Sequence, residues 1–470
     1  MPVNSTHRQY EAYRHKWTRC RDVIEGADAV KAKGEVYLPS LSGQSSDEYS
    51  AYKKRATFYN ASSRTLDALV GAIFRKSYQF VYPEVDRDKH VTVQNNSLTD
   101  FSKYTLNELL TTGRVGILVD MPPLNNITNR CYLVVYKAED IINWKVELVG
   151  DKLMLTMVVI REEYTEEIDE FEDQIKEQYR VLVLRDGVYV QEIYRLDSTT
   201  KDYTLVEQIV PTMRGSRIHE IPFIFSNWQK VGAEVIKPPL IDLVDINLSH
   251  YNSSADLEHG RHFTALPTAW VAGFPADITL KIGSSVAWIS EDPGAKAGFL
   301  EFTGQGLSSL EKALEQKEYQ MAIIGTRLLD VPKKGVEAAE TYKVRNMGEH
   351  NVLSSISLTL SDLFTRVFEF VAMWEGKSGD VVVSFNTDFT AVSMTPNEVT
   401  ALVKAYQSGT ISWETLFYNF QKGEIIEDGI TAEEEKARIE GDMILMGSPP
   451  PVNNIPSEEE SSEGVPLKNE

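Results

Sequence analysis

Apolar positions recur at helical spacing in two stretches near the start of the chain. A capping box of Ser45 and Glu48 opens the first stretch, which predicts one continuous helix ending near Arg75. A second helix is predicted over Thr99–Thr112, where Gly113 ends it. The stripe of the first helix consists of Tyr49, Tyr52, Ala56, Tyr59, Leu66, Val70 and Ile73.

Short runs of β-branched and aromatic residues then replace the helical pattern. Val115–Asp120 is almost entirely apolar and predicts a buried strand. Residues 131–210 contain four further strand-like runs, and Asp186-Gly187 between the last two favours a two-residue hairpin turn. Ile221–Trp228 predicts one more strand. The four runs are CYLVVY, KLMLTMVVI, YRVLVL and VYVQEIYRL.

Two long helices of similar length are predicted on either side of a compact segment. Residues 240–263 and 308–330 would span about 36 Å and about 34 Å at 1.5 Å per residue. Residues 264–306 between them are rich in Gly and Pro and contain three short strand-like runs, TAWVAGF, SVAWIS and GFLEF. An antiparallel helix pair with a small β-rich module at its tip is therefore expected. The apolar stripe of the first helix is Leu240, Val244, Leu248, Tyr251 and Ala255, and it weakens toward Glu258.

The rest of the chain is mainly helical. A long helix is predicted after residue 337, with a break around Asn346–Asn351, followed by a strand over Asp380–Phe385. Capping residues Thr395, Ser412 and Thr431 then predict three helices up to residue 446. From Gly447 the chain is rich in Pro, Ser and Glu and is expected to be disordered.

The charge changes this picture more than the overall composition does. The 470 residues carry a formal net charge of −21, which disfavours a basic nucleic-acid binder and attraction to an anionic membrane. Residues 161–177 contain nine acids and two bases. We expect a solvated loop or short helix at a sheet edge there, with an acidic docking patch as the alternative.

Targeting signals and cysteine pairs are absent from the sequence. The N-terminus lacks the apolar segment of a signal peptide, and no window approaches the ~18 apolar residues of a membrane span. The two cysteines, Cys20 and Cys131, form neither a disulfide framework nor a CxxC site. A soluble protein made in the cytoplasm is expected.

Catalytic motifs are largely missing as well. The chain has no Walker A motif, no Gly-rich dinucleotide fingerprint and no GxSxG. The best metal candidate is Glu258, His259 and His262, with His250 upstream. Two His at this spacing can share a helix face, but the zinc-protease pattern is absent. We therefore expect no enzyme, no metal and no cofactor, and keep a metal-dependent hydrolase at these residues as the alternative.

A small group of cations follows the second long helix. Lys333 and Lys334 lie in a predicted loop, and Lys343 and Arg345 follow close by. They are either ordinary solvated charges or a cationic ring that contacts phosphate in an otherwise acidic assembly.

The order of these elements resembles the portal proteins of tailed bacteriophages. Several stretches also resemble a portal-like phage family first described only as a domain of unknown function, and together they cover roughly residues 40–445. They are Glu48–Lys76, Gly113–Pro122, Ile221–Asn227, Leu240–Gly260 and Glu337–Ser355.

The resemblance implies an α+β multidomain portal fold with an α/β wing. The wing would comprise residues 1–237 and 351–394, and the helical crown residues 395–446. The stem helices would be 238–263 and 307–330, on either side of a β-rich clip at 264–306. A tunnel loop and kinked helix would occupy 331–350, and a disordered acidic tail 447–470.

The resemblance also implies a function. The chain would form a homo-oligomeric ring of about twelve subunits at one capsid vertex of the virion, assembled in the host cytoplasm. Double-stranded DNA would pass through the ring during packaging and ejection. The partners would be the terminase large subunit, a head–tail adaptor, and the major capsid and scaffolding proteins, without a membrane.

Two consequences follow from that implied function. An acidic lumen would let a duplex slide without salt-sensitive sticking. Lys333, Lys334, Lys343 and Arg345 would then lie near the constriction of the channel. Another phage head or tail adaptor remains an alternative, although adaptors are usually much shorter.

Overall fold

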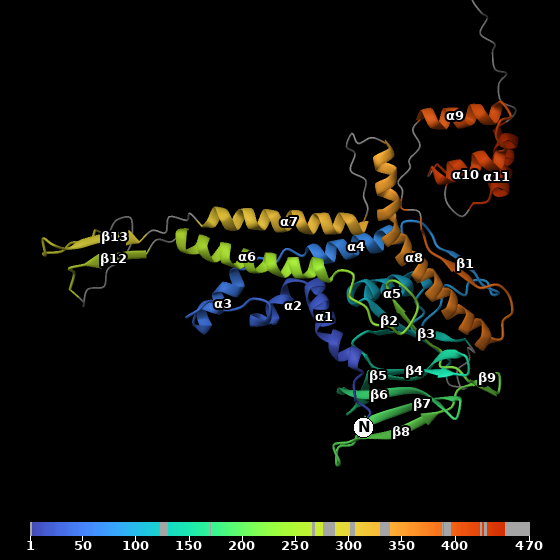
Figure 1. Cartoon of the computed structure of the whole chain (residues 1–470), viewed down its shortest axis with the longest axis horizontal. Coiled ribbons are helices and arrows are strands. Elements are labelled where there is room, and N and C mark those ends of the chain that lie inside the picture. The colour runs from blue at the N-terminus through green and yellow to red at the C-terminus, as the bar shows by residue number, and fades with distance from the viewer. Residues whose placement is uncertain are drawn as a thin grey trace, which may run out of the picture. The chain divides into compact units, whose positions relative to one another are not determined.

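A computed structural model describes residues 2–122, 130–169, 171–265, 268–275, 287–300, 306–329, 339–387, 389, 396–423, 425–426 and 430–446. The chain divides into two compact units, Met1–Phe389 and Thr390–Glu470. Helices and sheets both contribute (Figure 1), in agreement with the predicted α+β class. In the described part of the chain, no helix is both long and apolar enough to cross a bilayer.

A three-stranded antiparallel sheet forms the centre of the first unit. β2 (Arg114–Asp120) lies between β3 (Tyr132–Lys137) and β11 (Phe223–Asn227), and every residue of β2 is buried. A Cβ at Gly116 would lie 2.2 Å from Cζ of Phe223, so the phenyl ring occupies the space that glycine leaves. The strands predicted at Val115–Asp120 and Ile221–Trp228 are confirmed.

A five-stranded antiparallel meander follows along the chain. Asp186 and Gly187 join β6 to β7 with φ of 49° and 76°, which confirms the predicted two-residue hairpin. The strands, in sheet order, are β4 (Ile141–Val149), β5 (Lys152–Glu167), β6 (Asp173–Arg185), β7 (Val188–Leu196) and β8 (Tyr203–Ile209).

The acidic segment is neither a loop nor a helix, and that prediction was wrong. Residues Arg161–Glu167 pair with Asp173–Tyr179 and extend the β5–β6 hairpin. Tyr164, Ile168 and Ile175 are spaced irregularly among the acids, so the sequence shows no alternating strand pattern here. The two strands satisfy each other's backbone groups, so the charged side chains can remain in solvent.

The predicted helix from Ser45 to Arg75 is in fact two helices. α3 (Ser46–Arg55) begins with the predicted Ser45–Glu48 capping box, but Ala56 leaves helical conformation with ψ of 128°. Asn60 then caps α4 (Ala61–Ile73) through a bond from the Ser63 amide to its side chain. α5 (Leu98–Thr112) ends at Gly113, which adopts the left-handed conformation as predicted.

The remaining elements of the first unit are two N-terminal helices, a 3-10 turn, three long helices and paired short strands. The predicted break around Asn346–Asn351 does not interrupt the helical backbone of α8, although its axis changes direction in Figure 1. These elements are α1 (Arg8–Glu25), α2 (Ala27–Ala32), η1 (Gly34–Val36), α6 (Ile241–Ala265), α7 (Leu307–Leu329), α8 (Ala339–Glu375), β1 (Gln79–Val81) with β14 (Val382–Ser384), β9 (Thr212–Met213) with β10 (Ser216–Arg217), and β12 (Thr268–Ala272) with β13 (Lys296–Leu300).

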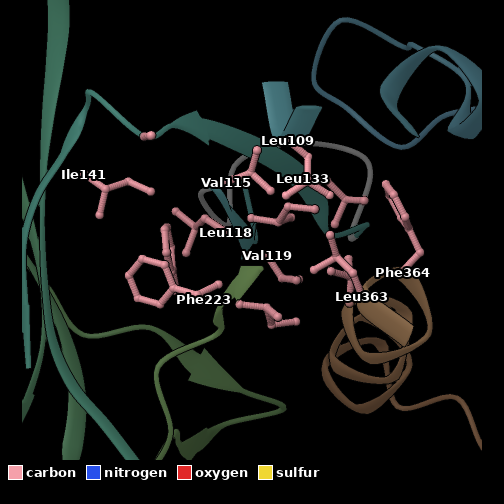
Figure 2. Close-up of a cluster of buried hydrophobic side chains, with 14 of the residues drawn as sticks. Leu109, Val115, Leu118, Val119, Leu133, Ile141, Phe223, Leu363 and Phe364 are labelled. Carbon is pink, nitrogen blue, oxygen red and sulfur yellow. The ribbon is translucent and has the colours of Figure 1, made fainter. Parts of the chain in front are cut away.

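The main core lies between the central sheet, α5 and α8. Leu363 and Phe364 of α8 point toward Val119 and Leu133 of the sheet, and Leu109 of α5 lies beside them (Figure 2). All of these side chains are at most 2% exposed. β-branched residues on the strands and long side chains on the helices therefore pack into one contiguous cluster.

The second unit contains α9 (Pro396–Gln407), α10 (Trp413–Lys422) and α11 (Ala432–Met446). Ser412 caps α10, and Thr431 and Glu434 form the predicted capping box at the start of α11. Thr395 and the tail after Gly447 lie outside the described residues. The three predicted helices are confirmed.

Candidate functional site

The long helices α6 and α7 lie side by side over much of their length (Figure 1). Arg261 Nη2 lies 2.9 Å from Glu311 Oε1, and His250 Nε2 lies 3.2 Å from Glu318 Oε1. Residue numbers of the contacting side chains rise along α7 as they fall along α6. The helices are therefore antiparallel, as predicted.

Several polar contacts join these two helices along their seam. Lys317 Nζ donates to Ser249 O at 2.8 Å and to Ser253 Oγ at 2.7 Å. Partial burial lowers the pKa of Lys317. The predicted stripe pattern did not identify this seam, because Ser249, Ser253 and Lys317 belong to the polar positions of each helix.

The apolar stripe of α6 faces a different set of helices. Leu248, Tyr251 and Ala255 are buried in a small core with α1, α2 and α3. Tyr52 Oη donates to Asp256 Oδ1 at 2.6 Å, and Arg19 Nε lies 3.2 Å from Asp245 Oδ1. The N-terminal helices therefore cover α6 along the side that its sequence pattern marks as apolar.

α7 has an apolar stripe of its own, which includes Leu307, Leu310, Leu314 and Met321, and in the single chain this stripe is only partly covered. Leu307, Leu310 and Leu314 are half-buried, and Tyr319 is 65% exposed. Near its other end Met321 is buried, and a Cβ at Gly325 would lie 3.1 Å from Thr65 Oγ1 of α4. The first half of α7 therefore leaves apolar surface open to a further partner.

The small module begins and ends at the same end of the helix pair. A Cβ at Gly260 would lie 2.6 Å from Leu307 Cδ2, so the end of α6 touches the start of α7. β12 and β13 pair antiparallel between them, as predicted for TAWVAGF and GFLEF. Ala287–Ser290 of the third run, SVAWIS, do not form a strand. Trp270 and Phe299 of the hairpin are 43% and 53% exposed.

The predicted channel cations are not brought together by any described contact. Lys333 and Lys334 lie outside the described residues. Lys343 and Arg345 belong to the first turns of α8, where the structure describes the backbone but not these side chains. Their role stays a prediction.

The residues of the alternative metal site have other partners. Glu258 Oε1 pairs with Arg261 Nη1 at 2.9 Å, and the His262 ring contacts Phe263. His259 Nδ1 lies 3.4 Å from Arg55 Nη2, and burial and that cation lower its pKa. Within the described ranges, no group of three or more His, Cys, Asp or Glu is arranged to hold a metal ion. The geometry therefore does not favour this alternative.

A buried ion pair that the sequence did not reveal ties the end of α8 to the β-rich part of the unit. Arg87 Nη2 lies 2.9 Å from Glu375 Oε1, with side chains 0% and 3% exposed. Glu375 also accepts bonds from the Cys131 amide and the Tyr82 hydroxyl. The partners are 288 positions apart, and no local pattern links them.

Comparisons with known proteins give limited matches. Residues 239–375, which include α6, α7 and α8, match a family described as a domain of unknown function (DUF4055). No curated protein matches the chain.

Among solved structures, the chain is similar to components of gene transfer agent (GTA) particles. For the virion of a native particle the TM-score is 0.38 at 10% identity, covering 90% of this chain and 99% of the other. For the neck of an empty particle computed with C6 symmetry the TM-score is 0.40 at 10% identity, covering 85% and 93%. For the neck of a native particle computed with C12 symmetry it is 0.37 at 9% identity, covering 83% and 91%.

Proposed function

We propose that this chain is a phage portal protein, a ring subunit at a unique capsid vertex of the virion. In this proposal a ring of about twelve copies encloses a channel for double-stranded DNA during packaging and ejection. The terminase large subunit, a head–tail adaptor, and the major capsid and scaffolding proteins are its partners. The chain itself has no enzymatic role and no cofactor.

The observation that carries the proposal is the long antiparallel pair α6–α7. Its tip holds a small β module, and the apolar stripe in the first half of α7 is only partly covered. Half-buried leucines on a long helix are typical of packing against a neighbouring helix. The helix pair would be the stem of the ring, β12–β13 its clip, and the second unit its crown.

Electron microscopy of the purified full chain tests the proposal directly. We expect rings with a central hole in projections of the wild-type protein. Leu314→Glu on the α7 stripe should reduce the fraction of rings at least tenfold, because a charge would enter the contact between neighbouring helices. Gln316→Glu adds the same charge at an exposed position of α7 and serves as the control. A stable monomer at every concentration would reject the proposal.

The proposed DNA channel has a separate test. Replacing Lys333, Lys334, Lys343 and Arg345 together with Ala should alter the amount of DNA packaged or retained while rings persist. Unchanged packaging would reject the assignment of these four cations to the channel.

A further inference from the structure

The β5–β6 hairpin extends beyond its sheet as a two-stranded acidic ribbon, whose described residues are 161–169 and 171–177. Its turn is held by bonds from the Phe171 and Glu172 amides to the Asp169 carboxylate, at 2.8 Å and 3.0 Å. The Ile168 amide donates to Glu172 O at 2.9 Å. With the turn held in this way, the Phe171 side chain is 93% exposed. Ile168 and Ile175 are 55% and 68% exposed.

Many of the acids on this acidic ribbon have no cationic partner. Glu166 pairs with Lys176, and Glu162 pairs with Arg180. Among the described residues, Glu163, Glu167, Glu172 and Asp173 make no ion pair. Exposing an aromatic side chain to water is unfavourable, and the carboxylates around it are unpaired. Such a surface suits a partner that is cationic and partly apolar.

A surface of the opposite character lies on the N-terminal helices. A groove of about 280 Å³ between α2 and α3 is lined by Asp28, Lys31, Ala32, Lys53 and Lys54. Lys31 Nζ donates to Lys54 O at 3.3 Å, and Lys53 Nζ lies 5.9 Å from the centre of the Tyr49 ring. In the part of the chain that the structure describes, none of the three lysines pairs with a carboxylate.

We propose that the acidic ribbon of one copy docks into this lysine groove of a second copy of the chain. Phe171 would lie along the methylene stems of the lysines and beneath an ammonium group, while Glu167 and Glu172 would pair with Lys53 and Lys54. The inference rests on the proposed ring and names one of its subunit contacts.

Two observations favour a second copy over another protein. The groove concentrates unpaired cations in a chain whose net charge is −21, and the ribbon is its densest acidic segment, so the two surfaces are complementary. The ribbon and the groove also belong to different elements of the same unit. A contact between two different patches is head-to-tail, and such contacts form a ring when the rotation between successive copies closes.

A charge-swap experiment on the full chain tests the contact. Lys53→Glu with Lys54→Glu should raise the protein concentration for half-maximal ring formation at least tenfold, measured by analytical ultracentrifugation and electron microscopy. Glu167→Lys with Glu172→Lys should do the same, and Phe171→Ala should weaken assembly at unchanged charge. Combining both swaps in one chain should restore assembly to within a few-fold of wild type.

The control carries the same charge reversal away from the groove. Lys145→Glu with Lys152→Glu changes two exposed lysines of the β4–β5 hairpin and should leave assembly unchanged. Circular dichroism checks that each variant is folded. If the wild type forms rings and either swap leaves them intact, or if the combined swap fails to restore them, the contact is overturned while the proposed function stands. A wild type that never self-associates overturns both.

Discussion

Arg87 and Glu375 form a buried ion pair, so each charge depends on the other for compensation. The guanidinium has no access to solvent, and its remaining donors reach the backbone carbonyls of His90 and Cys131. A buried ion pair of this kind contributes little relative to apolar residues, but losing one partner leaves a charge without compensation.

Glu375→Ala should therefore lower the free energy of unfolding by about 3–5 kcal/mol. Urea titration followed by fluorescence measures this. Asp362→Ala is the matched control, since it breaks the exposed Arg366–Asp362 pair and should cost less than about 1 kcal/mol. A similar small loss for both variants would contradict the assigned role of burial.

Glu84 links two cations and makes stability depend on pH. A hydrogen bond from Lys377, helped by the charge of Arg130, holds the pKa of its carboxyl below the ordinary value of 4.5, although burial opposes this shift. The ionised carboxylate therefore stabilises the folded state above pH 4.5, and this contribution is lost as pH falls further.

Replacing Glu84 with Gln removes that contribution. The variant should be less stable than wild type at pH 7, and the difference should shrink as the pH is lowered below 4.5. Thermal unfolding at several pH values measures it. A difference that stays constant between pH 7 and pH 3 would show that the carboxylate charge is not responsible.

At the scale of elements, two glycines show how the same substitution can have opposite effects. Gly116 lies in the central strand β2, where a Cβ would fall 2.2 Å from Phe223 Cζ and 2.9 Å from Ile141 Cδ1. Gly71 lies in α4, where a Cβ would meet nothing within 4 Å. An added methyl group at Gly116 would overpack the core. At Gly71 it would meet no neighbour and would only raise the helix propensity of α4.

Gly116→Ala should accordingly destabilise the protein by about 1–3 kcal/mol. Gly71→Ala should stabilise it by up to about 1 kcal/mol. Denaturant unfolding of both variants beside wild type gives the two values. An equal effect of the same sign at both positions would contradict this account.

Elements with strong local signals were predictable from the sequence. The caps at Ser45 and Ser412, the stop at Gly113 and the hairpin at Asp186-Gly187 each rest on a side chain or a backbone conformation that neighbouring residues determine. The break at Ala56 was missed, because the apolar spacing continues through the position where the backbone leaves the helix. α1 was missed too, since its few buried apolar positions, Tyr10, Trp17, Cys20 and Val23, lie among many charges.

The candidate site was predictable in outline and not in detail. Helix length and the Gly-rich insert were sufficient to predict an antiparallel pair with a module at its tip. The Lys317–Ser253 seam and the Tyr52–Asp256 bond were not, because each joins residues far apart whose types are common on any surface. The role of Lys333 and Lys334 is still known only as a prediction.

At the scale of the whole molecule, the chain consists of two compact units divided between Phe389 and Thr390. Both buried hydrophobic clusters, which include residues of α6 and of the sheets, lie in the first unit. A chain ended after Phe389 should therefore keep its core, and its urea unfolding should remain a single cooperative transition. Loss of near-ultraviolet circular dichroism in the shortened chain would show that the second unit is needed for folding.

The distance along the chain between Arg87 and Glu375 also matters during synthesis. At roughly 5–20 residues per second, the ribosome needs about 15 to 60 seconds to add the residues that separate them. The central sheet is complete only when Asn227 of β11 has been added, and from then until residue 375 is added neither the helix that covers the sheet nor the carboxylate that neutralises Arg87 is complete. We expect the nascent chain to expose apolar surface for that time, and its yield in cells to depend on chaperones that hold it until residue 375 emerges.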